Sequence, residues 1–241
     1  MVLPLNLAMT PSEIASAVTL PERISWMSCH FCAYTEGITN IPETLPQGAM
    51  LILTDRESCA GHSPDLVSQQ LLDTVQRFGC ESVLLDFQRP WEPESDIMVK
   101  TIVNALPCPV AVTETFANDS SCPVFLAPCP LHISPAEYLR PWNNREIWLE
   151  AALSQENITI TCEGTMFAPA YPVQQLSGGF YNRQLHCRYY ISVSDNNITF
   201  TLFDTPETLH EKLSEARLLG VSRAVGLWQE LGTFLPGMQS S

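Results

Sequence analysis

The sequence is poor in basic residues: 12 lysines and arginines stand against 26 aspartates and glutamates, which gives a net charge of −14. Such an acidic chain repels a phosphate backbone, so nucleic acid is not an expected partner. The sequence also lacks any apolar run near the roughly 18 to 20 residues that a membrane helix needs, so we expect no membrane partner. Its first residues have no basic leader and no small-residue cleavage site, unlike a signal peptide.

The nine cysteines form no evident framework, because an odd number cannot all pair and several lie inside apolar runs. The closely spaced pair Cys29 and Cys32 has no second Cys or His pair to complete a structural zinc site. We therefore expect reduced thiols, a cytoplasmic location, no metal and no cofactor. The oligomeric state is left open.

Apolar content is what the sequence does have, with 45% hydrophobic and only 16% charged residues. Short runs rich in Val, Ile and Leu alternate with helical patterns, which is typical of parallel strands covered by helices. The expected strands are 23–31, 49–55, 82–88, 108–114, 123–129, 157–163 and 223–229, and the expected helices are 63–79, 92–106, 143–155 and 205–220. This order favours one (β/α)8 TIM-type barrel domain over residues 1–241, somewhat reduced.

One segment departs from this order. Residues 185–204 alternate aromatic and β-branched residues with polar ones on both sides of a turn at 195–197, which predicts a β-hairpin inserted before the last βα unit. The strand numbering depends on this segment. If the hairpin supplies a barrel strand, residues 82–88 form the third strand rather than the fourth.

Polar residues stand where the expected strands end, and in barrels of this kind function sits at the carboxyl ends of the strands. These residues are Asp55, Asp86 with Gln88, Glu114, Glu163, and Trp228 with Gln229. Carboxylates beside aromatic rings suit sugars, whose C–H faces stack on the rings while their hydroxyls form hydrogen bonds. The alternative is that each polar residue only marks the point where its strand leaves the core.

Two segments carry a resemblance to a known family. "GCESVLLDFQ", which follows "LLDTVQRF", resembles the fourth strand of glycoside hydrolase family 18, the chitinase-like barrels, whose pattern is D-G-x-D-x-D-x-E. Residues 185–232 resemble that family's late hairpin, the helix after it, and the final strand with its sugar-stacking tryptophan, here Trp228. The resemblance covers about 49–90 and 185–232 and is closest to the small spore-wall-type members.

The resemblance implies a specific defect in the catalytic strand. In the family, the last Glu of the pattern protonates the leaving oxygen, and the Asp two residues earlier orients the substrate's acetamide group. Asp86 matches that Asp, but Gln88 stands in the place of the acid. Because an amide has no proton to donate, the resemblance implies glycan binding without efficient hydrolysis.

The implied ligand is a glycan that contains amino sugars. Asp86 and Gln88 are expected to hydrogen-bond to it, Trp228 to form the floor of the site, and Asp55, Trp91 and Gln229 to contribute further contacts. Two alternatives stay open. Another carboxylate, Glu114 or Glu163, could replace the acid and restore hydrolysis, or the barrel could serve as a structural or partner-binding protein.

Overall fold

The computed structural model describes residues 3–117, 121–170, 176–194 and 197–234, and it contains a closed barrel of eight parallel strands. In spatial order these are β1 (Leu5–Met9), β2 (Ile24–Phe31), β4 (Met50–Thr54), β5 (Ser82–Asp86), β6 (Val110–Thr113), β7 (Val124–Leu126), β8 (Ile147–Ala151) and β14 (Val221–Leu227). Pairing of β1 with both β14 and β2 closes the ring. The short strand β3 (Ile38–Thr39) pairs with β2 outside it. The predicted TIM-type barrel is confirmed.

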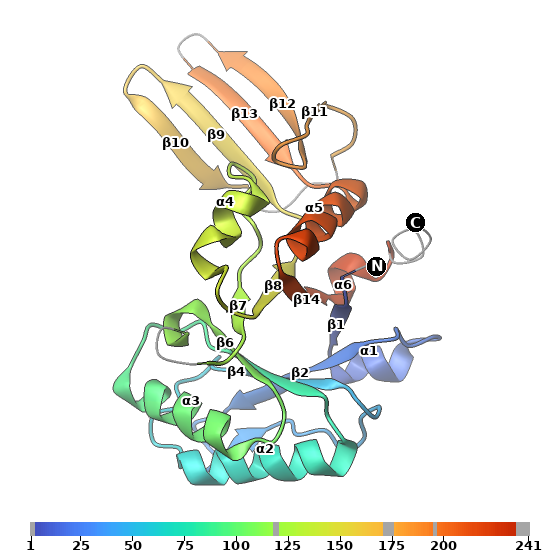
Figure 1. The fold of residues 1–241 in the computed structure, drawn as a ribbon, viewed down its shortest axis with the longest axis vertical. Coiled ribbons are helices and arrows are strands. Elements are labelled where there is room, and N and C mark those ends of the chain that lie inside the picture. The colour runs from blue at the N-terminus through green and yellow to red at the C-terminus, as the bar shows by residue number, and fades with distance from the viewer. Residues whose placement is uncertain (1–2, 118–120, 171–175, 195–196, 235–241) are drawn as a thin grey trace.

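Helices cover the barrel unevenly. They are α1 (Pro11–Ser16), α2 (Pro64–Phe78), α3 (Pro93–Ala105), α4 (Pro135–Leu139), α5 (Pro206–Leu218) and α6 (Trp228–Leu231), with 3-10 turns η1 (Glu114–Phe116) and η2 (Arg140–Trp142). The long helices α2 and α3 lie side by side against the outside of the barrel (Figure 1). The β2–β4 connection carries only β3 and the β6–β7 connection carries η1, so the barrel is reduced as expected.

Local sequence explains where the long helices begin and end. The Ser63 hydroxyl accepts the Leu66 N–H at the start of α2, and Pro64 occupies the first helical position. The same helix ends at Gly79, whose φ of 59° lies in the left-handed region that favours glycine. Helix α5 begins in the same way, with the Thr205 hydroxyl accepting the Thr208 N–H.

Two apolar layers hold the barrel together. An interior cluster consists of Ala8, Met50, Ile52, Leu84, Ala111, Phe125, Trp148 and Val225. A larger outer cluster lies between the strands and the helices and includes Leu53, Leu71, Leu85 and Ile102. Because successive side chains of a strand point to opposite faces, Leu84 lies inside while Leu85 lies outside. Both faces of these strands are therefore buried.

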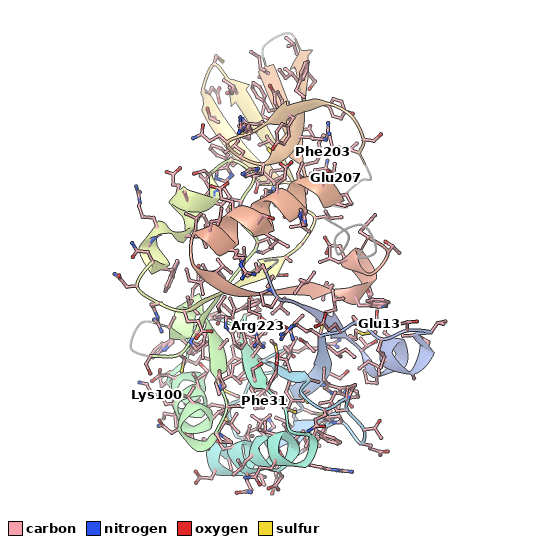
Figure 2. The ribbon with its side chains drawn as sticks, turned by 45° about the vertical axis from the view of Figure 1, so that its right-hand side comes forward. Glu13, Phe31, Lys100, Phe203, Glu207 and Arg223 are labelled. Carbon is pink, nitrogen blue, oxygen red and sulfur yellow. The ribbon has the colours of Figure 1, made fainter. Side chains whose placement is uncertain are left out.

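An ionic cluster lies at the amino-terminal end of the barrel. Arg223 (Figure 2) has its Nη1 2.8 Å from Glu81 Oε1 and 2.7 Å from Ser82 Oγ, and its guanidinium lies 4.6 Å from the Trp148 ring centroid. Arg23 pairs with the same Glu81 carboxylate at 3.3 Å. Glu81, the first acidic residue of the strand motif, thus serves the end of the barrel opposite to the candidate site.

A second sheet is inserted between β8 and α5. It has five antiparallel strands in the order β10-β9-β13-β12-β11, namely β9 (Gln155–Thr161), β10 (Gly164–Pro169), β11 (Phe180–Asn182), β12 (Cys187–Ser194) and β13 (Asn197–Phe203). It projects away from the barrel at the top of Figure 1. The predicted hairpin is β12 with β13, although two residues of its turn, 195–196, lie outside the described residues. The insertion is larger than expected because β9, β10 and β11 belong to it.

Two expectations about individual elements were wrong, and one strand was missed. Residues 143–155 were expected to form a helix but contain β8, a barrel strand buried on both faces whose continuous apolar run does not distinguish strand from helix. Residues 157–163 were expected in the barrel, but β9 belongs to the inserted sheet. Strand β1 was not foreseen. With β1 included, β5 is the fourth strand, as the family 18 resemblance requires.

Two observations concern the cysteines and the helices. All nine cysteines are free thiols. Among the helices in the described part of the chain, none has the length and apolar content to span a bilayer.

A buried ion pair secures the return from the inserted sheet to the barrel. Lys212 Nζ lies 2.6 Å from Asp204 Oδ1, and the two side chains are only 6% and 2% exposed. Asp204 also accepts hydrogen bonds from the Thr208 hydroxyl and the Ser154 N–H. The pair therefore links the end of β13, the first turns of α5 and the segment after β8.

Removing the Lys212 charge tests this link. Lys212→Met leaves a buried carboxylate without its partner, which is expected to lower the free energy of unfolding by about 3–5 kcal/mol. Urea denaturation measures the loss. The control is Lys100→Met, which removes the exposed Lys100–Asp96 pair of α3 and is expected to cost less than about 1 kcal/mol. Equal losses in the two variants would contradict the proposed link.

Candidate functional site

The carboxyl-terminal end of the barrel, here called the mouth, receives two acidic side chains from facing parts of the ring. Leu84 and Trp148 belong to the interior cluster. Asp86 lies two residues beyond Leu84 on β5, and Glu150 lies two residues beyond Trp148 on β8, so both carboxyl groups face the interior, one layer nearer the mouth. Leu84 and Trp148 form the layer beneath them.

Gln88 is hydrogen-bonded to Asp86. The Gln88 Nε2 donates to Asp86 Oδ1 at 2.5 Å, and the Gln88 side chain is otherwise exposed. Burial raises the pKa of Asp86 above its ordinary value, the Gln88 hydrogen bond lowers it, and the nearby charge of Asp55 raises it. The two residues that the strand motif singled out thus act as one unit at the mouth.

Asp55 holds the backbone of the turn that carries Gln88. Its two carboxylate oxygens accept the backbone N–H groups of Gln88 at 2.7 Å and of Arg89 at 2.9 Å. The Asp55 side chain is only 4% exposed. Asp55 therefore holds the backbone just after β5 in place, and its predicted contact with a ligand stays a prediction.

Among the acidic groups described at the mouth, Glu150 has the largest change in pKa. Burial raises its pKa from 4.5 to about 7, and the charges of Asp86 and Glu230 add to the rise. A carboxyl group with this pKa is about half protonated at neutral pH, so it can donate or accept a proton there. Sequence reasoning missed Glu150 because its segment was expected to be a helix.

Further polar groups surround Glu150. Glu230 Oε1 accepts the backbone N–H of Leu153, and burial raises the pKa of Glu230. The Tyr138 hydroxyl donates to the Ala127 carbonyl at 2.9 Å, and burial together with the charges of Glu114 and Glu150 raises its pKa. Glu230 follows Trp228 and Gln229 directly, and this acidic position next to two predicted site residues was the signal that could have revealed it.

Of the other two predicted carboxylates, Glu114 lies at the mouth and Glu163 lies far from it. Glu114 begins η1 directly after β6, at the mouth, and its side chain is exposed. Glu163 was expected at a barrel strand end, but it occupies the exposed turn between β9 and β10. That turn follows the 7 residues of β9, which places it about 20 Å along the inserted sheet from the end of the barrel. Glu163 therefore does not join Asp86.

The two predicted aromatic residues, Trp91 and Trp228, lie in different places. Trp91 is 54% exposed and lines a cavity beside α3. Trp228 begins α6 and packs against the outer cluster, next to Gly232, where an added Cβ would come within 2.8 Å of the indole ring. The layer beneath the mouth carboxyl groups is made by Leu84 and Trp148 rather than by Trp228. Gln229 is exposed on α6.

The described part of the chain contains no group of three or more His, Cys, Asp or Glu side chains that could hold a metal ion. A carboxylate–amide pair, Asp86 with Gln88, can accept and donate hydrogen bonds, and Glu150 can exchange a proton near neutral pH.

Comparison with known proteins bears on the fold. No protein-family model matches the sequence, and no curated protein matches it. Solved structures do match: a GH18 chitinase from Cycas revoluta has a TM-score of 0.58 at 9% identity, covering 98% of this chain and 97% of that chain. A class V chitinase from Nicotiana tobaccum gives 0.59 at 9% identity (94% and 93%). The spore cortex-lytic enzyme SleL from Bacillus cereus gives 0.53 at 10% identity (93% and 70%).

This chain has the fold of the family 18 chitinases. The resemblance stated from the strand motif and the C-terminal segment is confirmed at the level of the fold. At an identity of 9% or 10% the likeness concerns the fold alone, so the chemistry of this chitinase-like barrel depends on its own side chains.

Substitution of Glu150 tests whether its carboxyl group is desolvated in this chitinase-like barrel. Because its folded pKa of about 7 exceeds the ordinary 4.5, the cost of ionisation is absent below pH 4.5, grows as the pH rises to 7, and is complete above it. Glu150→Gln is therefore expected to gain up to about 3 kcal/mol relative to wild type between pH 4.5 and pH 8. Urea denaturation at both pH values measures this gain.

The matched control for that experiment is Glu163→Gln, in the exposed turn between β9 and β10. It is expected to change the free energy of unfolding little at either pH. If Glu150→Gln and wild type differ by the same amount at pH 4.5 and pH 8, the Glu150 carboxyl group is hydrated rather than buried.

Proposed function

We propose that this chitinase-like barrel binds an amino-sugar-containing glycan at its mouth without hydrolysing it efficiently. The observation that carries the proposal is the pairing of Gln88 with Asp86 at the end of the fourth barrel strand, with Nε2 2.5 Å from Oδ1. By resemblance, that position belongs to the proton donor of the family. An amide there can hold a sugar but cannot protonate a leaving oxygen.

Binding requires groups that a sugar can use. The Gln88 amide keeps one N–H and its carbonyl oxygen beyond the bond to Asp86, so the pair can donate to and accept from hydroxyl and acetamide groups. Asp55 fixes the backbone beneath it, which lowers the entropy lost when a ligand binds. The site is thus held in place before the ligand arrives.

The solved structures support an oligosaccharide as the ligand. The Cycas revoluta chitinase is in complex with (GlcNAc)3, and a Glu-to-Gln mutant of the Nicotiana tobaccum chitinase is in complex with NAG4. A chitinase barrel in which one Glu is replaced by Gln is therefore compatible with a bound tetrasaccharide. This chain carries such an amide naturally at Gln88.

Glu150 favours a second candidate function, a working glycoside hydrolase. Its pKa of about 7 is suited to a general acid, and it faces the same interior as Asp86. Of the two carboxylates considered from the sequence, Glu163 lies on the inserted sheet and Glu114 is exposed at the start of η1. Glu150 is the better placed replacement for the missing acid.

Calorimetric titration with N-acetylglucosamine oligomers, followed by product analysis, separates the two candidates. The proposal expects measurable affinity and no shortened products from the wild-type protein. Gln88→Glu restores a proton donor at the end of β5 and is expected to produce hydrolysis, since general acid help typically contributes about 10² to 10⁴ in rate. Gln76→Glu, an exposed amide on α2, is the matched control and should stay inactive.

Two outcomes contradict the binding proposal. Hydrolysis by the wild-type protein that disappears in Glu150→Gln contradicts the binding proposal and establishes the second candidate. Absence of binding to every oligomer contradicts both and leaves the structural or partner-binding alternative. A cytoplasmic location stays a prediction.

A further inference from the structure

We propose that the chain has a second saccharide site outside the mouth, a side cavity beside α3 that binds one neutral sugar unit against Trp91. The proposal does not rest on the glycan site at the mouth. The side cavity has a volume of about 320 Å³ and lies between the β5–α3 loop, one face of α3 and η1. That volume is at the lower end of the range for small-molecule sites, which suits a single sugar ring.

The wall of the side cavity is an aromatic ring that the protein itself leaves uncovered. Trp91 is 54% exposed and lines the cavity. It stands in the turn just before α3, between Pro90 and the N-cap Glu92, and Pro93 begins the helix, so the chain on both sides of the ring is restricted. A large, rigid ring of this kind loses little entropy when a sugar stacks on it.

The lining of the cavity also offers hydrogen-bonding groups. The Asn104 amide lies near the end of α3, and the Thr115 hydroxyl lies on η1; both residues are exposed and line the cavity. Valine side chains of α3 and the Phe116 ring supply the apolar part of the lining. A lining that combines an aromatic ring with amide and hydroxyl groups suits a sugar, which presents C–H bonds on its faces and hydroxyl groups at its edge.

The charges of the cavity favour a neutral ligand. Lys100, labelled on α3 in Figure 2, is paired with Asp96 at 2.8 Å, and both side chains line the cavity. Because the ammonium and carboxylate charges offset each other, the cavity has no unbalanced charge from this pair to attract an ion. A chain with a net charge of −14 further disfavours an acidic sugar.

The side cavity and the mouth are separate but share a wall. Phe116, which lines the cavity, packs edge-on against Phe87 with ring centroids 5.9 Å apart. Phe87 stands between Asp86 and Gln88 in the chain. Its ring belongs to the outer cluster, whereas the side chains of Asp86 and Gln88 face the mouth. The two sites can therefore be altered independently, Trp91 for one and Gln88 for the other.

Calorimetric titration with the N-acetylglucosamine trimer tests the side cavity with wild type, Trp91→Ala, Gln88→Ala and the double variant. Two binding events per chain are expected in wild type and one in each single variant. Loss of the ring is expected to weaken binding at the side cavity roughly tenfold or more, as truncation of a central aromatic contact commonly does. Tyr34→Ala, which removes another exposed ring (95% exposed), is the matched control and should bind as wild type.

The outcomes separate failure of the side cavity from failure of the mouth. A binding event that survives Gln88→Ala and disappears in Trp91→Ala supports the side cavity, whether or not the mouth binds. Identical titrations for Trp91→Ala and wild type overturn it, as does a wild-type chain that binds no trimer. Glucuronic acid serves as a charged probe; if it competes at the Trp91 site as well as N-acetylglucosamine does, the assignment of a neutral ligand is wrong.

Discussion

The candidate site depends on the carboxylate of Asp55, which accepts two consecutive backbone N–H groups just beyond the fourth barrel strand. These two bonds fix the turn at Gln88 and Arg89 and thereby direct the Gln88 side chain back onto Asp86. A buried carboxylate is costly to desolvate, and charge-assisted hydrogen bonds to backbone amides offset that cost. The position of Gln88 therefore depends on Asp55, an almost fully buried residue that directly follows the neighbouring strand β4.

The electrostatics of the mouth follow from the same packing. Asp86 and Glu150 lie above the interior apolar cluster that includes Leu84 and Trp148, and burial there makes ionisation of both groups unfavourable. The hydrogen bond from Gln88 favours the ionised form of Asp86, whereas the charges of Asp86 and Glu230 add to the effect of burial and raise the pKa of Glu150 further. The two carboxyl groups of the mouth therefore differ in how their surroundings affect their protonation.

Prediction from the sequence succeeded where a local signal was unambiguous and failed where it was not. Helix α2 was predicted from its cap residues and terminal glycine, and β5 from its apolar run. Strand β8 was missed because "IWLEA" has apolar residues on both faces and gives no period that separates strand from helix. Strand β9 was recognised as a strand, but the sheet to which a strand belongs depends on distant pairing partners that no local pattern names.

The sequence by itself determined the barrel class and the spacing that brings the Gln88 amide next to Asp86, because these depend on chain order and residue chemistry. Only the tertiary structure decided that Glu150 shares the mouth, that Glu163 lies on the inserted sheet and that Asp55 supports a turn. Each of these depends on which strands become neighbours when the barrel closes. Closure is a property of the whole ring, set by long-range packing and hydrogen bonding.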